Sequence, residues 1–143
     1  VWASEYVRYA LTPRASSISV LLCNFTNNSA VKGGAFACNE KSTAFVHASR
    51  FENNTALARG GALIIRNAST TILGSIFTRN AADSGGAFRV TEQSMVKMES
   101  SIVTENTAAG IGGAGMHLSS STVELLANTF TRNVAVNGGG GAL

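Results

Sequence analysis

Residues 51–64 read FENNTALARGGALI, and this stretch decides the fold because the chain repeats its two fixed parts. The first part is the Phe-x-x-Asn motif from Phe51 to Asn54, and the second is the Gly-Gly-Ala motif at 60–62. Phe-x-x-Asn occurs five times at steps of 26, 26, 26 and 27 residues, with Val103 replacing Phe in the fourth copy. Gly-Gly-Ala follows every copy. A fixed period of this length is typical of a solenoid, in which each repeat stacks on the next.

The segment before each Phe-x-x-Asn motif alternates between apolar and other residues. In the fourth copy Val96 and Met98 alternate with Lys97 and Glu99, which is the pattern of a half-buried strand. A second short strand is predicted after each of the first four Gly-Gly-Ala motifs, so the repeat holds two or three strands and no helix. The inward-facing sets predicted for the first strand are Ile18, Val20 and Leu22; Ala44, Val46 and Ala48; Thr70, Ile72 and Gly74; Val96, Met98 and Ser100; and Val123, Leu125 and Ala127.

A repeat of short strands cannot bury its own apolar face, so successive copies must share one core. The sequence therefore predicts an all-β fold, a right-handed parallel β-helix of about five rungs, where a rung is one circuit of the chain around the axis. The right hand follows from the preference of parallel crossover connections. Leucine-rich repeats are excluded because their LxxLxL spacing is absent.

Each repeated position becomes a column along such a coil. The aromatic column is expected to stack, and the Asn column to form an amide ladder between rungs. The paired glycines are expected to turn the backbone sharply, with positive φ at one of them. These columns are predicted to be primarily structural, and the Gly and Asn turn edge is the part that would contact a partner. The residues are Phe25, Phe51, Phe77 and Phe130; Asn28, Asn54, Asn80, Asn106 and Asn133; and Gly33, Gly34, Gly60, Gly61, Gly85, Gly86, Gly112 and Gly113.

The domain organisation is predicted as two parts. Residues 17–143 carry the repeats, whereas residues 1–16 do not fit them and form either a packed loop or a partial preceding rung, or a projecting contact loop with Trp2, Tyr6 and Tyr9. The chain starts at Val1 and ends inside a Gly-Gly-Ala-Leu motif. We therefore expect a fragment of a longer domain, packed against neighbouring rungs of its own parent chain.

Composition excludes several classes of partner. The chain is 45% hydrophobic and 13% charged, which predicts a folded protein. Its net charge is +3, and the basic residues are scattered singly, so no nucleic acid is expected as a partner. No apolar run reaches the roughly 18 residues of a membrane-spanning helix.

The residues needed for catalysis are scarce in this segment. Asp83 is the only aspartate, and Glu52 is the only acidic residue at a position that is Thr in the other copies. His47 and His117 have no Cys, Asp or Glu at ligand spacing, so no metal, no cofactor and no catalytic residue is predicted. One alternative remains open: the segment is the scaffold part of a carbohydrate-active β-helix enzyme, of the polysaccharide lyase or hydrolase kind, whose catalytic rungs lie outside it.

Cys23 and Cys38 are the only two cysteines and lie in one predicted rung. They are either free thiols or an intra-rung disulfide, which would contribute about 3 kcal/mol in the chain-entropy model. The sequence leaves both alternatives open.

The combination of Phe-x-x-Asn with Gly-Gly-Ala and an apolar residue, as in FENNTALARGGALI (51–64) and FTRNAADSGGAF (77–88), resembles the repeats of the chlamydial polymorphic outer membrane proteins. The resemblance covers residues 17–143. It implies a secreted or surface-displayed β-helical passenger, carried in that family by a C-terminal autotransporter barrel and linked with adhesion to host cells. The resemblance thus predicts an extracellular or cell-surface segment, on the outer membrane if bacterial, with a cell-surface protein or a glycan as its ligand.

Overall fold

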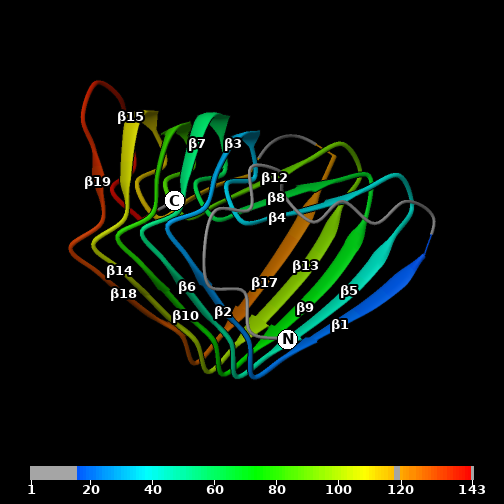
Figure 1. Cartoon of the computed structure of the whole chain (residues 1–143). Helices are drawn as coiled ribbons and strands as arrows, with labels where there is room; N and C mark the ends of the chain where they lie inside the picture. The colour runs from blue at the N-terminus through cyan, green and yellow to red at the C-terminus, as the bar shows by residue number, and fades with distance from the viewer. Residues whose placement is uncertain (1–15, 118–119, 143) are drawn as a thin grey trace.

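The computed structural model describes residues 16–117 and 120–142, and these form a stack of short parallel strands wound around one axis (Figure 1). Four rungs contain four strands each, and a fifth contributes three. No helix occurs in the described ranges. The parallel β-helix predicted from the repeat is confirmed. The predicted segment 1–16 lies outside the described residues except for Ser16.

Strands at the same place in successive rungs pair in parallel and form four sheets (Figure 1). The first sheet contains β1 (Ser17–Leu21), β5 (Thr43–His47), β9 (Ser69–Leu73), β13 (Met95–Glu99) and β17 (Thr122–Leu126). The second contains β2 (Asn24–Thr26), β6 (Arg50–Glu52), β10 (Ile76–Thr78), β14 (Ile102–Thr104) and β18 (Thr129–Thr131). The third contains β3 (Ser29–Lys32), β7 (Thr55–Arg59), β11 (Ala81–Ser84), β15 (Thr107–Ile111) and β19 (Val134–Ala135). The fourth contains β4 (Phe36–Asn39), β8 (Leu63–Arg66), β12 (Phe88–Thr91) and β16 (Gly115–His117).

The strand register aligns the repeated residues with one another. Phe51 pairs with Phe25 on one side and with Phe77 on the other. The complete rungs have four strands rather than the predicted two or three, because the residues between the Asn and the Gly-Gly-Ala motif form a strand of their own in the third sheet. We number the corners between sheets in chain order: the first corner follows the first sheet, and the fourth corner closes the rung.

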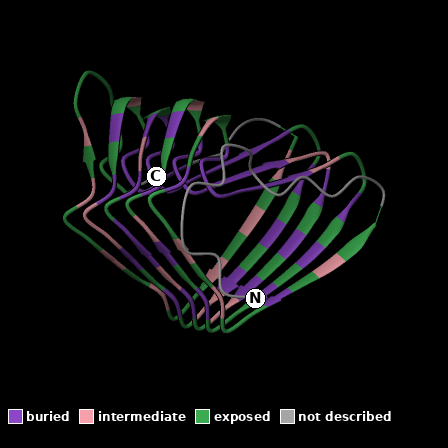
Figure 2. Ribbon diagram, viewed as in Figure 1, coloured by how far each residue is buried: buried purple, intermediate pink, exposed green. Residues whose placement is uncertain are grey.

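The core is a set of apolar columns inside the coil, where the buried stretches of the strands lie (Figure 2), and one of these columns is aromatic. Phe25 and Phe51 stack with ring centroids 4.8 Å apart and an interplanar angle of 1°. Phe51 and Phe77 stack at 4.7 Å and 2°. These separations match the distance between neighbouring strands of a sheet, so the three rings stack at the spacing of the rungs. Val103 continues the column as a fully buried residue.

The first sheet ends one residue earlier than the sequence predicted. Ile18, Val20 and their equivalents point inward, but the third member of each predicted inward set is exposed and has a positive φ. The correction has a physical reason: the chain must leave the sheet at this corner, and a single left-handed residue turns it. The residues concerned are Leu22 (φ 52°), Ala48 (47°), Gly74 (55°), Ser100 (51°) and Ala127 (52°).

The second corner contains the amide ladder. Nδ2 of Asn80 donates to Oδ1 of Asn106 at 2.9 Å and to the carbonyl oxygen of Phe51 at 3.0 Å. Oδ1 of Asn80 accepts from both Nδ2 and the backbone N–H of Asn54, each at 3.0 Å. The same side-chain bonds run without a break from Asn28 to Asn133. The amide of Asn80 thus uses both donors and both acceptor sites, which only an amide side chain of this length provides.

The two glycines of the third corner have different roles. The first has a positive φ, for example +63° at Gly60, which fits the predicted left-handed turn. The second approaches its neighbours closely: a Cβ on Gly61 would overlap the carbonyl oxygen of Gly86 in the next rung. The first position therefore needs glycine for its conformation and because a Cβ there would overlap the carbonyl oxygen of Leu63, and the second needs it for the space between rungs.

Replacing Asn80 by Ala should lower the free energy of unfolding by about 1–3 kcal/mol, because buried donors and acceptors of Asn54, Asn106 and Phe51 lose partners. Urea denaturation of the full chain measures the change. Thr55→Ala, at an exposed position of β7, is the control and should stay within about 0.5 kcal/mol of the parent. Equal midpoints for the two variants would contradict a stabilising ladder.

Gly61→Ala should destabilise the chain by about 3 kcal/mol or more, since the new methyl group meets backbone atoms that can move only by separating rungs. Gly74→Ala should cost only about 1–2 kcal/mol, the cost of the left-handed conformation, because nothing lies within 4 Å of its Cβ position. Gly139→Ala, with open space around it and no positive φ, should change little. Gly139→Ala should have the highest melting temperature, Gly74→Ala a lower one and Gly61→Ala the lowest. Any other order would contradict the different requirements at these three positions.

Candidate functional site

The repeated motif residues face inward in the central rungs. Phe51, Phe77, Asn54 and Asn80 are fully buried, and the glycines of the first four Gly-Gly-Ala motifs are buried as well. The ladder Asn and the corner glycines of these rungs are therefore covered by the coil, and partner contact through the Gly and Asn turn edge stays a prediction. The residue just before each ladder Asn has a positive φ and lies at the surface: Asn27, Asn53, Arg79 and Arg132 are exposed, and Glu105 is half-buried.

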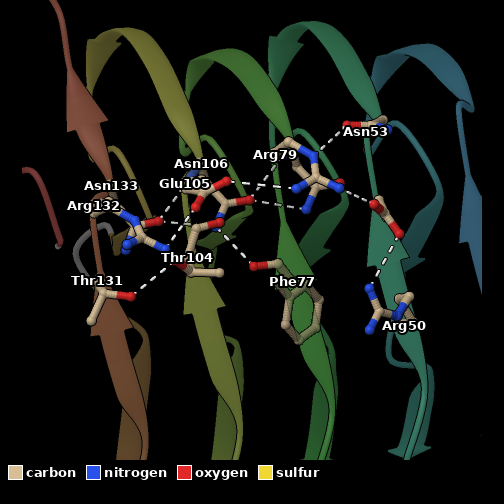
Figure 3. Close-up of polar contacts among 12 residues, drawn as sticks. Arg50, Asn53, Phe77, Arg79, Thr104, Glu105, Asn106, Thr131, Arg132 and Asn133 are labelled. Atoms are coloured by element: carbon tan, nitrogen blue, oxygen red, sulfur yellow. Dashed lines mark hydrogen bonds and ion pairs between the residues drawn. The ribbon is translucent and has the colours of Figure 1, made fainter.

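Arg79, Glu105 and Arg132 of this column carry alternating charges, and together with Arg50 and Glu52 of β6 they form a chain of ion pairs (Figure 3). Arg79 lies between two carboxylates: its Nη2 binds Glu52 in the rung before, and its Nη1 lies 3.6 Å from Glu105 in the rung after. Glu105 also binds Arg132 at 2.7 Å, and Glu52 binds Arg50 at 3.2 Å. We call these five residues the charge ladder.

The charge ladder is a surface feature rather than a buried one. Arg79 and Arg132 are 50% and 74% exposed, so each pair contributes about 0.2–1 kcal/mol to stability. Its guanidinium and carboxylate groups remain within reach of a partner. Sequence reasoning missed it by treating the glutamates as isolated, although Arg79, Glu105 and Arg132 share one position of the repeat, which is a readable signal.

A second polar ladder lies at the first corner, and sequence reasoning did not predict it either. The backbone N–H of Ser49 donates to Oγ of Ser75 at 3.2 Å, and that of Ser75 donates to Oγ of Ser101 at 3.1 Å. The ladder continues to Asn128, whose Oδ1 accepts from the N–H of Ser101 at 2.9 Å. The recurrence of Ser at one position of the repeat is the sequence feature that could have predicted this ladder. This ladder is structural, because its central members are buried.

The remaining carboxylates and histidines are dispersed. Asp83 is exposed in β11, and His47 is exposed in β5, 6.0 Å from Phe45 between ring centroids. The backbone of His117 pairs with Val90. Within residues 16–117 and 120–142, no three His, Cys, Asp or Glu residues lie close enough together to hold a metal ion.

Comparison with known protein families matches the described coil. The family model for a right-handed β-helix region matches residues 8–143. The chain belongs to the right-handed β-helix family. The family gives the hand of this β-helix, which agrees with the hand predicted from the sequence. Searches of the curated proteins and of the solved structures found no match. The described part of the β-helix contains no helix that is long and apolar enough to cross a membrane.

The two cysteines of the β-helix are free thiols, so the alternative of an intra-rung disulfide is not what the structure contains. Cys23 occupies the Ser49 position of the first corner, where its N–H donates to Oγ of Ser49 at 3.1 Å and its Sγ to the carbonyl of Leu21 at 3.2 Å. Cys38 lies in β4 and is fully buried. Burial raises the pKa of the Cys38 thiol, and the neighbouring Thr70 hydroxyl partly opposes this shift.

Thiol labelling should distinguish the two cysteines. A maleimide should modify Cys23 first in the folded chain, because Cys23 is half-buried whereas Cys38 is inaccessible and has a raised pKa. We expect Cys38 to react at least about tenfold more slowly, and both to react alike in denaturant. Peptide mass spectrometry gives the two rates. Equal labelling rates in the folded chain, or one cross-linked peptide containing both cysteines, would contradict the conclusion that the two thiols are free and differ in reactivity.

Proposed function

We propose that this β-helix is a segment of an extracellular or surface-displayed passenger, and that it adheres to a cell-surface protein or glycan through the exterior of a rigid rod. The observation that supports this most directly is that the inward-facing and outward-facing positions of the repeat have different roles. The Phe, Asn and Gly columns hold the rungs together, whereas the charge ladder is presented outside at regular intervals. The resemblance of the repeats to those of polymorphic outer membrane proteins supports the same proposal.

The mechanism is multivalent contact. The rungs repeat at about 4.8 Å, so the guanidinium and carboxylate groups of the charge ladder form a row of closely spaced, alternating basic and acidic groups. Each contact is weak, because exposed ionic groups are well solvated. Several contacts on one rod add through effective concentration. The proposal assigns no catalytic step to this segment.

An adhesion assay with matched variants tests the proposal. Fluorescently labelled chain is titrated onto cultured epithelial cells, and Arg79→Gln/Glu105→Gln is compared with Lys97→Gln/Glu99→Gln. Both double variants remove one positive and one negative charge, and the second removes an exposed pair, 4.0 Å apart, from the first sheet. We expect roughly a fivefold or greater loss of binding for the charge-ladder variant and none for the control, since several contacts are lost together.

Two results would contradict the proposal. The first is a parent chain that binds the cells no better than a heat-unfolded sample. The second is binding that falls equally in both double variants, since the loss would then follow from general charge removal. Circular dichroism of each variant verifies that the β-helix is intact.

A further inference from the structure

Two exposed asparagines at the second corner each begin an Asn-x-Ser/Thr sequence. Residues 27–29 read Asn-Asn-Ser, and residues 53–55 read Asn-Asn-Thr. This tripeptide is the sequence at which exported proteins receive N-linked glycans, and a folded protein carries such a glycan on an asparagine at its surface. The second corner meets both requirements, sequence and exposure, in its first two rungs.

The side-chain amide of Asn53 is available for this modification. Its Oδ1 accepts a hydrogen bond from Nε of Arg79 at 3.2 Å (Figure 3), whereas its Nδ2 has no hydrogen bond to any described residue. A glycan on Nδ2 would therefore leave the bond to Arg79 in place. The next residue, Asn54, differs because it is buried and its Nδ2 donates to Asn80 and to the carbonyl oxygen of Phe25. Only the first asparagine of this pair can carry a glycan in the folded chain.

The hydroxyl residue that completes each tripeptide is not needed by the fold. Thr55 begins β7 with an exposed side chain, and its hydroxyl makes no hydrogen bond among the described residues. Ser29 is the equivalent residue of β3 and is also exposed. Ala81 has this position in the third rung and Val134 in the fifth, so packing does not require a hydroxyl there. The modification, by contrast, does require one.

Two other Asn-x-Ser/Thr sequences, at 24–26 and 67–69, are less suited to a glycan. Asn24 lies in β2 and pairs with Arg50, so a glycan there would lie against the side chains of the next rung. Asn67 is half-buried and lines an open hollow of about 530 Å³ together with Arg59 and Arg89. The fold therefore favours the two asparagines of the second corner.

We propose that Asn53 and Asn27 are attachment sites for N-linked glycans. Nδ2 attacks the anomeric carbon of an oligosaccharide carried on a polyprenyl diphosphate, the donor that a secretory pathway supplies. The bond between nitrogen and carbon forms while the bond from that carbon to the diphosphate oxygen breaks, so polyprenyl diphosphate leaves and Nδ2 gives up one proton. The inference rests on the extracellular placement in the proposed function and does not depend on adhesion.

The glycans divide the second corner into two parts. The column that contains Asn53 is uncharged in the first two rungs and charged in the last three. A bulky, hydrated glycan on Asn53 covers the end of the charge ladder at Glu52 and Arg79, because Asn53 contacts Arg79 directly. Glu105 and Arg132 stay open, so contacts with a partner are confined to the later rungs.

Production of the full chain behind a cleavable export signal in cultured human cells tests the proposal, because these cells supply the lipid-linked donor. The chain is purified from medium and cells together, so the result does not depend on efficient release. Peptide mass spectrometry before and after peptide-N-glycosidase F, which converts a glycosylated Asn to Asp, identifies each modified residue. We expect glycans at Asn53 and at Asn27, each on the order of half of the molecules or more.

Three substitutions sharpen the test. Thr55→Ala removes the required hydroxyl but keeps Asn53, so glycan at Asn53 should fall at least about tenfold. Thr107→Ala changes the equivalent exposed threonine of β15, where Glu105 stands in place of Asn53, and is the matched control that should change no glycan. Glu105→Asn completes the same tripeptide at 105–107 and should add a glycan there.

Each asparagine is judged separately, and the absence of a glycan from the parent chain disproves that site. Glycan at Asn53 that persists in Thr55→Ala, or glycan mainly at the half-buried Asn67, would also overturn the assignment. Failure here is distinguishable from failure of the adhesive function. A chain that adheres to cells but has no glycan disproves the glycan sites alone, and a chain that has the glycans but does not adhere disproves adhesion alone.

Discussion

The backbone amides at the corners impose the constraint on which this structure depends. Within strands, the N–H groups donate to carbonyl oxygens of the neighbouring rung, but at the corners the chain leaves the sheets and its buried N–H groups need other acceptors. Side-chain oxygens supply them at the first, second and fourth corners, as for the N–H groups of Ser49, Asn54 and Ser94. Two glycines bring the backbone close enough at the third, where the N–H of Gly61 reaches the carbonyl of Gly85 at 3.0 Å. The strict period of the repeat follows, because each acceptor must lie one rung from its donor.

This constraint determines which residues remain for contacts outside the coil. An inner ladder Asn such as Asn80 has all its hydrogen-bonding groups engaged, and a corner Gly has no side chain. The exterior positions next to them are under no such requirement, and they differ between rungs: Asn53, Arg79 and Glu105 occupy one column. Conserved spacing with variable exterior side chains is what a scaffold for binding requires.

The period, the stacked Phe column and the strand alternation were predictable because each depends on residues whose spacing is visible in one dimension. The left-handed residues at 22, 48, 74, 100 and 127 were not, because Leu, Ala and Ser in that conformation are selected by the corner and not by their own preference. The charge ladder could have been found from the shared position of Arg79, Glu105 and Arg132. The hollow lined by Arg59, Asn67 and Arg89 could not, since these residues come from different strands and corners of two rungs.

The two exterior surfaces differ in how they can bind. In the charge ladder Arg79 is already paired with two carboxylates, so a partner must exchange one ion pair for another, and the net gain at each site is small. In the hollow lined by Arg59, Asn67 and Arg89, Nε of Arg89 has no pair to exchange among the described residues, and Arg89 is largely shielded from water. A bond formed there replaces an unsatisfied group, which gives a larger gain and stricter geometry. The charge ladder is therefore suited to broad contact summed over many rungs, and the hollow to selecting one chemical class of ligand.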